Sequence, residues 1–326
     1  MTAVIPMASG KGGVGKTVLS ANLGVALARR GRTVILVDLD LGGSNLHTCL
    51  GIRNNHPGLG SFIYQKTESL ESLIVDTDQS RLYLIPGDSL LPGTANLPFF
   101  IKNRILKELP KLVADVVLLD LGSGSAFNTV DFFLIAGDGI IVTTPETTSI
   151  LNAYSFLKTA LYRALYRSFP ARSPQRELIQ AFITKKIEGT PEPFLSLVRE
   201  IAERFKDSGP AADKVLADFK PRFILNMGRD ENEAGLGRKL EEISLKNLGV
   251  RLSFLGSTAY DPAVGRSVAE RRPVMLGCPE CAFSQSVDRI GQRLGAAAPP
   301  EAPRFFSDPD ELSLPPEAGS GPPVQG

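Results

Sequence analysis

Short apolar runs alternate with amphipathic stretches along most of the chain. Continuous apolar runs are typical of strands that helices cover on both faces. The strand candidates are Ala3–Ala8, Thr33–Asp38, Leu82–Ile85, Val116–Leu121, Gly139–Thr144, Arg222–Asn226 and Arg251–Gly256. Helical spacing is clearest at Thr17–Arg30, Lys102–Leu112, Thr147–Tyr166 and Glu233–Leu248. This alternation predicts an α/β fold, a mostly parallel twisted sheet with helices on both faces.

The pattern also predicts how the chain is divided. Residues 1–296 read as one large domain, with a helical excursion over about 169–219 where prolines interrupt the apolar spacing. Residues 297–326 hold eight prolines and five acids against one base. Such a segment buries too little apolar surface to offset its ordering entropy, so we expect a disordered, acidic, Pro-rich tail.

Composition excludes several classes of protein. The chain has 326 residues, 43% hydrophobic and 22% charged, as in ordinary globular proteins. No apolar run approaches the ~18 residues that span a bilayer, and the N-terminus lacks a secretory pattern. Three cysteines cannot build a disulfide framework, so we expect a cytoplasmic protein. The net charge of +1 comes from 36 basic and 35 acidic residues; without the tail, 35 bases and 30 acids leave the body at +5.

The strongest motif follows the first apolar run. Gly10, Gly15, Lys16 and Thr17 satisfy the pattern G-x-x-x-x-G-K-[ST] between a strand and a helix. Glycines let backbone N–H groups surround a phosphate, and the helix N-terminus adds a positive dipole. The lysine reaches the outer phosphates and the hydroxyl serves Mg²⁺. The motif predicts a magnesium-dependent nucleotide site.

Carboxylates at two strand ends support this interpretation. Asp38 and Asp40 stand two residues apart after the second apolar run, and Asp120 ends Val116–Asp120 as a Walker B acid would. A pair that only caps a loop is the alternative for Asp38 and Asp40. Lys11 is a second lysine in the loop that cannot easily fold back onto its own phosphate. We therefore expect the Lys11 side chain to act on a nucleotide bound in a partner subunit.

The run Ser9–Thr17, with Asn22 and Leu23, resembles the deviant Walker A motif of the MinD/ParA family of dimerising ATPases. Within this family Asp38–Leu46 is most similar to the MinD and FlhG branch, and the resemblance covers about residues 3–295. Val18 departs from it, because the family usually has a hydroxyl residue there. The resemblance implies a P-loop ATPase that forms a homodimer with ATP. It also implies slow, partner-stimulated hydrolysis of ATP to ADP and phosphate, and the positioning of flagella, the division site or another polar structure.

The resemblance also implies roles for individual residues. Lys11, Lys16 and Asp40 would be catalytic, and Thr17, Asp40 and Asp120 would serve Mg²⁺. The predicted ATP contacts are Gly10, Gly12, Gly13, Val14, Gly15, Lys16, Thr17, Val18, Asp38, Asn45, Asn226, Met227 and Pro262. The segment Asp38–Asn45 resembles switch I, in which Asp38 would support the loop, and Leu121–Ser125 resembles switch II. Pro145 with Glu146 matches an element beside the nucleotide. For Asn226, reading the adenine edge and capping its strand both stay open.

Partners are less determined by the sequence. An activating or cargo protein is implied but not identified. The segment 158–186 has seven basic residues and one acid. Four interpretations stay open for it: a solvent-exposed helix face, a surface for a protein partner, a surface that binds DNA at the nucleoid, and one that binds anionic lipid at the inner membrane. The last helix, about Ser284–Leu294, lacks the basic and aromatic face of a membrane-binding helix. Two rival functions stay open: a ParA-type DNA partitioning ATPase, and a metal-cluster carrier built on Cys278 and Cys281.

Overall fold

A computed structural model describes residues 2–87, 97–187, 193–229, 233–295 and 305. In this part of the chain an eight-stranded sheet has the order β3-β4-β2-β5-β1-β6-β7-β8. Only the β3–β4 pair is antiparallel; the other neighbouring pairs are parallel. The strands are β1 Ala3–Ser9, β2 Val34–Leu39, β3 Val75–Asp76, β4 Leu82–Ile85, β5 Val116–Ser123, β6 Ile140–Thr143, β7 Arg222–Gly228 and β8 Ser253–Ala259. The predicted fold class is confirmed, and β3 is the strand that the apolar pattern did not predict.

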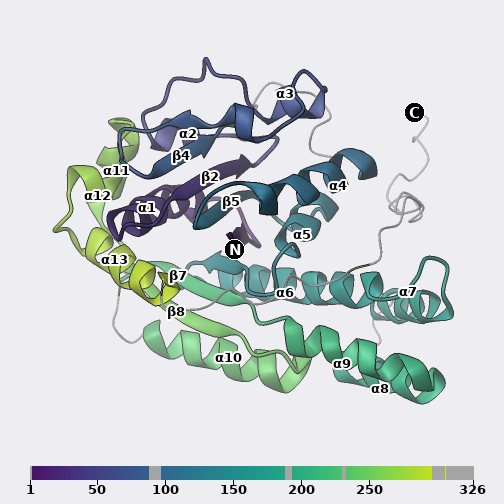
Figure 1. Ribbon diagram of the computed structural model, residues 1–326. Coiled ribbons are helices and arrows are strands. Elements are labelled where there is room, and N and C mark those ends of the chain that lie inside the picture. The colour runs from purple at the N-terminus through teal and green to yellow at the C-terminus, as the bar shows by residue number, and fades with distance from the viewer. Residues whose placement is uncertain (1, 88–96, 188–192, 230–232, 296–304, 306–326) are drawn as a thin grey trace, which may run out of the picture.

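Helices cover both faces of this sheet (Figure 1). The first half of the chain contains α1 Lys16–Arg29, α2 Leu46–Cys49, α3 Leu59–Ile63, α4 Phe99–Glu108, α5 Phe127–Phe133 and α6 Thr147–Arg167. The second half contains α7 Pro174–Ile187, α8 Phe194–Arg204, α9 Gly209–Asp218, α10 Ala234–Leu248, α11 Pro262–Ala269, α12 Val274–Gly277 and α13 Ala282–Gly295. Three short 3₁₀ turns, Glu71–Leu73, Leu109–Lys111 and Lys206–Ser208, complete the described elements.

The central strands divide their side chains between two cores. In β2, Val34 and Leu36 pack in the core under α1, α12 and α13, whereas Ile35 and Val37 pack under α4 to α6. All four side chains are at most 2% exposed. Successive residues of a strand point to opposite faces, so a strand between two helix layers must be apolar at every position. This explains the continuous apolar runs of the sequence.

The helical excursion folds onto the α6 side of the sheet as α7, α8 and α9. In the basic segment 158–186, three of the seven basic side chains, Arg163, Arg167 and Arg176, are buried. Arg163 and Arg167 bind the carboxylate of Asp131 on α5, and Arg176 donates to backbone carbonyls. The segment therefore offers a smaller basic surface to DNA or lipid than its sequence predicts.

The predicted tail, 297–326, lies outside the described residues except for Phe305. The Phe305 ring packs between α6 and α9, in a pocket shared with Phe219, and lies 5.1 Å from the guanidinium carbon of Arg167. The division into a domain and a disordered tail stays a prediction. Among the described helices none combines the length and the apolar character needed to cross a membrane.

Candidate functional site

The loop between β1 and α1 turns tightly at the carboxyl edge of the sheet. Gly10 lies against the start of α6, where a Cβ atom would be 2.1 Å from the carbonyl oxygen of Asn152. Gly15 has a φ of 78°, in the left-handed region, and it caps the N-terminus of α1. Both positions therefore require glycine. The turn places backbone N–H groups and the positive end of the α1 dipole at one point, which suits a phosphate group.

The other predicted contacts of this loop are close by. They lie in the same turn or in the first turn of α1, and they are Gly12, Gly13, Val14, Lys16, Thr17 and Val18.

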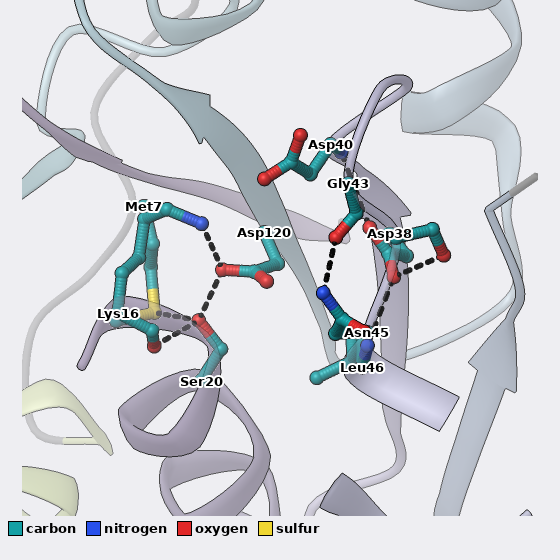
Figure 2. A network of polar contacts seen from close by, with 10 residues as sticks. Met7, Lys16, Ser20, Asp38, Asp40, Gly43, Asn45, Leu46 and Asp120 are labelled. Carbon is teal, nitrogen blue, oxygen red and sulfur yellow. Dashed lines mark hydrogen bonds and ion pairs between the residues drawn. The ribbon is translucent and has the colours of Figure 1, made fainter. Parts of the chain in front are cut away.

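Lys16 and Asp120 form a buried ion pair at the centre of the site (Figure 2). The Lys16 Nζ lies 2.7 Å from Asp120 Oδ1, and the two side chains are 6% and 1% exposed. The Ser20 hydroxyl lies 2.9 Å from the same carboxylate oxygen and 3.0 Å from the Lys16 carbonyl. Since β1 and β5 are adjacent in the sheet, the loop lysine and the Walker B acid meet directly. Lys16 is thus held by the acid that the sequence assigned to magnesium.

Asp38 holds the loop that follows β2. Its Oδ1 accepts the Asp40 N–H at 3.1 Å, and its Oδ2 accepts the Ser44 hydroxyl at 2.7 Å and the Leu46 N–H at 3.0 Å. Burial, together with the charge of the neighbouring Asp120, raises the pKa of Asp38 to about 7. The side chain is fully buried, so it braces this loop from inside instead of facing a phosphate. This fits the supporting role in switch I that the resemblance implies, whereas the orientation does not support the direct ATP contact predicted for Asp38.

Asp40 and Asn45 lie on the braced loop itself. The Asp40 carboxylate extends away from the Asp38 hydrogen bonds (Figure 2), and a Cβ atom on Gly122 of the predicted switch II would be 3.5 Å from it. The Asn45 side chain is exposed and donates to the Gly43 carbonyl at 2.6 Å. The two predicted switch loops therefore meet beside Lys16 and Asp120, with Asp40 between them.

Lys11 stands apart from this buried network. Its side chain is 47% exposed, and its Nζ lies 4.0 Å from the Glu146 carboxylate, which is 70% exposed. An exposed pair at this distance restrains either side chain only weakly. Lys11 can therefore leave Glu146 and extend outward, as a cation that serves a second subunit must do.

A cavity of about 360 Å³ opens beside the start of α1. Five predicted nucleotide contacts line it: Gly15, Val18, Asn226 and Met227 at the end of β7, and Pro262 at the start of α11. The Asn226 amide donates to the Val14 carbonyl at 2.7 Å and accepts the Thr258 hydroxyl. Its carbonyl and one amide hydrogen thus tie β7 to the phosphate loop and to β8.

The sequence reasoning missed three hydroxyl residues that complete these contacts. Ser20 bonds Asp120, Ser44 bonds Asp38, and Thr258 bonds Asn226. Only Ser20 carried a usable signal, because it stands four residues after Lys16 and so shares its face of α1. Ser44 and Thr258 reach their partners through loop and sheet geometry that residue spacing does not encode.

The residues at this edge fit a nucleotide and Mg²⁺. Asp120 Oδ2 and the Ser9 hydroxyl are buried and have no hydrogen-bond partner among the described residues. Native proteins rarely leave such groups unsatisfied, so both are suited to a polar ligand. Thr17, Asp40 and Asp120 supply the oxygen donors that Mg²⁺ prefers. The assignment of individual contacts to ATP and Mg²⁺ stays a prediction.

In the described part of the chain, the phosphate-loop edge included, no group of three or more His, Cys, Asp or Glu side chains is placed to hold a metal ion. Mg²⁺ at this edge would therefore also need the Thr17 hydroxyl and the phosphates. Cys278 and Cys281 likewise lack the further ligands that a mononuclear metal site needs within one chain.

One known protein resembles the chain over most of its length, and two others resemble about half of it. The antiactivator FleN of Pseudomonas aeruginosa is 26% identical over 304 residues, 92% of this chain and 89% of FleN. The septum site-determining protein MinD of Bacillus subtilis is 37% identical over 161 residues, and the flagellum site-determining protein YlxH of Helicobacter pylori is 33% identical over 164. The last two matches span only about half of each chain. The MinD match covers 47% of this chain and 57% of MinD, and the YlxH match covers 48% of this chain and 53% of YlxH.

Solved structures share the fold. MinD of Pyrococcus horikoshii, complexed with Mg-ADP, has a TM-score of 0.60 at 23% identity over 91% of this chain and 97% of its own. A ParA family ATPase of Chlorobium tepidum has a TM-score of 0.58 at 18% identity over 89% and 98%. The model of the CobQ/CobB/MinD/ParA nucleotide-binding domain matches residues 5–274. The resemblance read from the phosphate loop is thus confirmed, and the chain belongs to the CobQ/CobB/MinD/ParA nucleotide-binding family.

Proposed function

We propose that this protein is an ATP-hydrolysing switch that dimerises with ATP and directs the position of a cellular structure. The proposal rests on one observation: Lys16, Asp120 and Asp40 lie close together beside the glycine-rich loop, next to a cavity of about 360 Å³. FleN, similar over 92% of the chain, and the site-determining proteins MinD and YlxH support spatial control of flagella or the division site as the task.

ATP binding would begin by exchanging the partner of Lys16. In the structure Lys16 neutralises Asp120 in a buried pair. A triphosphate brings more negative charge than one carboxylate, so Lys16 would move to the phosphates and release Asp120. Asp120, Thr17 and Asp40 would hold Mg²⁺, which when bound would neutralise phosphate charge. The adenine would occupy the cavity lined by Val18, Asn226, Met227 and Pro262.

Hydrolysis and dimerisation would depend on two different charged residues. Asp40, placed where the switch loops meet, orients the attacking water. Lys11 crosses to the partner subunit and stabilises the charge that develops on the transferred phosphate, as arginine fingers do. A dimer formed this way persists until hydrolysis, so slow turnover acts as a timer that a partner protein can shorten.

With three arginines of the segment 158–186 buried, we favour a protein partner over DNA. Because three cysteines cannot build a disulfide framework, we also propose a cytoplasmic location. The DNA-partitioning and cluster-carrier functions have no specific structural observation in their favour.

Phosphate release from Mg-ATP tests the proposed activity. The full chain should release phosphate at a slow, magnesium-dependent rate, and Lys16→Ala should lose nearly all of it. A thermal melt of each variant identifies loss by unfolding, since Lys16 is buried. Folded wild-type protein that neither binds nor hydrolyses ATP would refute the proposal. A folded Lys16→Ala protein with unchanged turnover would refute the assigned site.

A further inference from the structure

Two cysteines lie at the ends of the tight turn that joins α12 to α13. In Cys278-Pro279-Glu280-Cys281 the Cys281 N–H donates to the Cys278 carbonyl at 3.3 Å. This bond closes a β-turn with proline at its second position, where the fixed φ of proline fits. The first and fourth Cα atoms of such a turn lie within about 7 Å. Disulfides join Cα atoms about 4.4–6.8 Å apart, so the turn itself brings the pair into range.

The thiols already face each other. Both residues are half-buried, and the neighbouring Cys281 side chain raises the pKa of the Cys278 thiol. Buried Ser284 holds this arrangement, since it accepts the Cys281 thiol at 3.4 Å and donates to the Cys278 carbonyl at 2.8 Å. Pro279 and Glu280 are exposed, so a small molecule can reach the pair from solvent.

Asp261 connects the turn to the predicted adenine cavity. It accepts the Ala263 N–H at 2.9 Å and so caps α11, and its other carboxylate oxygen accepts the Phe283 N–H at 3.5 Å. Asp261 and Phe283 both line the cavity. Cys281 stands two residues before Phe283, so a change at Cys281 is transmitted along the backbone to the cavity wall.

We propose that Cys278 and Cys281 are a thiol modification site, which small disulfides oxidise to an intramolecular disulfide, and that this bond weakens nucleotide binding in the neighbouring cavity. The second part rests on the proposed function. One thiolate attacks a sulfur of glutathione disulfide and expels one glutathione thiolate. The second thiolate then attacks the mixed disulfide and expels the other glutathione. Two electrons pass from the protein to the oxidant, and both thiol protons go to water or to the released thiolates.

The physical reason for weaker binding is the loss of one hydrogen bond. In the disulfide, Cys281 has no S–H to donate to Ser284 and its sulfur is held by Cys278, which displaces the start of α13 and breaks the bond from the Phe283 N–H to Asp261. A hydrogen bond to a charged group contributes about 1.5 kcal/mol or somewhat more, so we expect about tenfold weaker nucleotide binding.

Mass spectrometry of the full chain tests the disulfide. Reduced protein is incubated with glutathione disulfide at pH 8.5, since the neighbouring Cys281 side chain raises the pKa of Cys278. Free thiols are then alkylated and the protein is digested. We expect a 278–281 disulfide in the wild type and in the matched control Cys49→Ser. Cys278→Ser and Cys281→Ser should stop at the mixed glutathione adduct. Two alkylated thiols at 278 and 281, a disulfide to Cys49, or stoichiometric zinc or iron on the pair after anaerobic purification would overturn the proposal.

Binding of a fluorescent ATP analogue tests the link to the cavity. The dissociation constant should rise about tenfold on oxidation of the wild type and stay constant in Cys278→Ser/Cys281→Ser. Equal affinity of the oxidised and reduced wild type would overturn the link. If the reduced protein bound no nucleotide, the proposed function would fail together with the link, while the mass spectra alone would still decide the disulfide.

Discussion

Replacing Asp131 should destabilise the protein strongly, because this carboxylate pairs with three buried cations. It lies on α5, directly after the predicted switch II, and it is 0% exposed. Arg163 binds it through Nε at 2.8 Å and Nη2 at 3.0 Å, and the Arg167 Nη1 lies 3.2 Å away. Lys102 of α4 completes the cluster. One side chain thus joins α5 to α4 and α6.

The magnitude follows from the burial of these groups. Lys102, Arg163 and Arg167 are 4%, 9% and 5% exposed, so they stay out of water when the carboxylate is removed. Removing one partner of a buried ion pair costs about 3–5 kcal/mol. We expect Asp131→Ala to lose about 4 kcal/mol of unfolding free energy, a large part of the roughly 5–15 kcal/mol that folded domains possess. With a urea m-value of about 3 kcal/mol/M, the unfolding midpoint falls by about 1.3 M.

Urea unfolding followed by circular dichroism measures this shift. Asp288→Ala is the matched control, since Asp288 pairs with Arg30 at 2.8 Å with side chains 49% and 31% exposed. Exposed pairs contribute about 0–1 kcal/mol, so this midpoint should move little. Equal shifts for the two variants would refute the reasoning.

The pH dependence of the same experiment gives a second test. Burial alone would raise the pKa of Asp131, but the hydrogen bond and charge of Arg163, with the charges of Arg167 and Lys102, outweigh it and lower the pKa. A lowered pKa stabilises the fold above the unfolded value of about 3.9, and this contribution disappears as the pH falls through the folded pKa. The difference between wild type and Asp131→Asn should be constant from pH 5 to 8 and shrink below about pH 4.

Two further substitutions probe the site. Gly10→Ala places a Cβ atom 2.1 Å from the Asn152 carbonyl oxygen and must displace the phosphate loop, so ATP turnover should fall about a hundredfold. The control Gly235→Ala, with no atom within 4 Å of the new Cβ, should keep the wild-type turnover. Equal turnover of the two variants would contradict the close approach at Gly10. Asn226→Ala leaves the buried Thr258 hydroxyl and the Val14 carbonyl without this hydrogen-bond partner. Calorimetry should therefore show about tenfold weaker nucleotide binding. An unchanged affinity would show that the adenine does not bind beside Asn226.

The sequence was informative where one physical rule dominates. Burial on both faces makes the parallel strands apolar throughout, which located β2, β4 and β5 to within two residues at each end. The phosphate loop was equally clear, because only glycine satisfies the close approach at Gly10 and the positive φ at Gly15. The two-residue β3 strand was not predicted, since Val75–Asp76 is too short to show any period.

Charge pairing between residues far apart in the sequence was the main feature that sequence patterns did not predict. Arg163 and Arg167 look like surface residues in the sequence, and only the packing of α5 against α6 shows that they surround Asp131. The ion pair between Lys16 and Asp120 is likewise a property of the folded sheet, because 104 residues separate the two positions along the chain. Which residue neutralises which charge is decided by strand order, and apolar spacing does not encode that order.

Light scattering of wild type and Lys11→Ala, each with ADP and with ATP, tests the central claim most directly. The account predicts a wild-type mass that doubles from 35.0 kDa with ATP but not with ADP. Lys11 is exposed and outside the buried network, so Lys11→Ala should still bind nucleotide yet remain at the monomer mass with ATP. A full ATP-induced dimer of Lys11→Ala, or a wild type that stays monomeric with ATP, would contradict it.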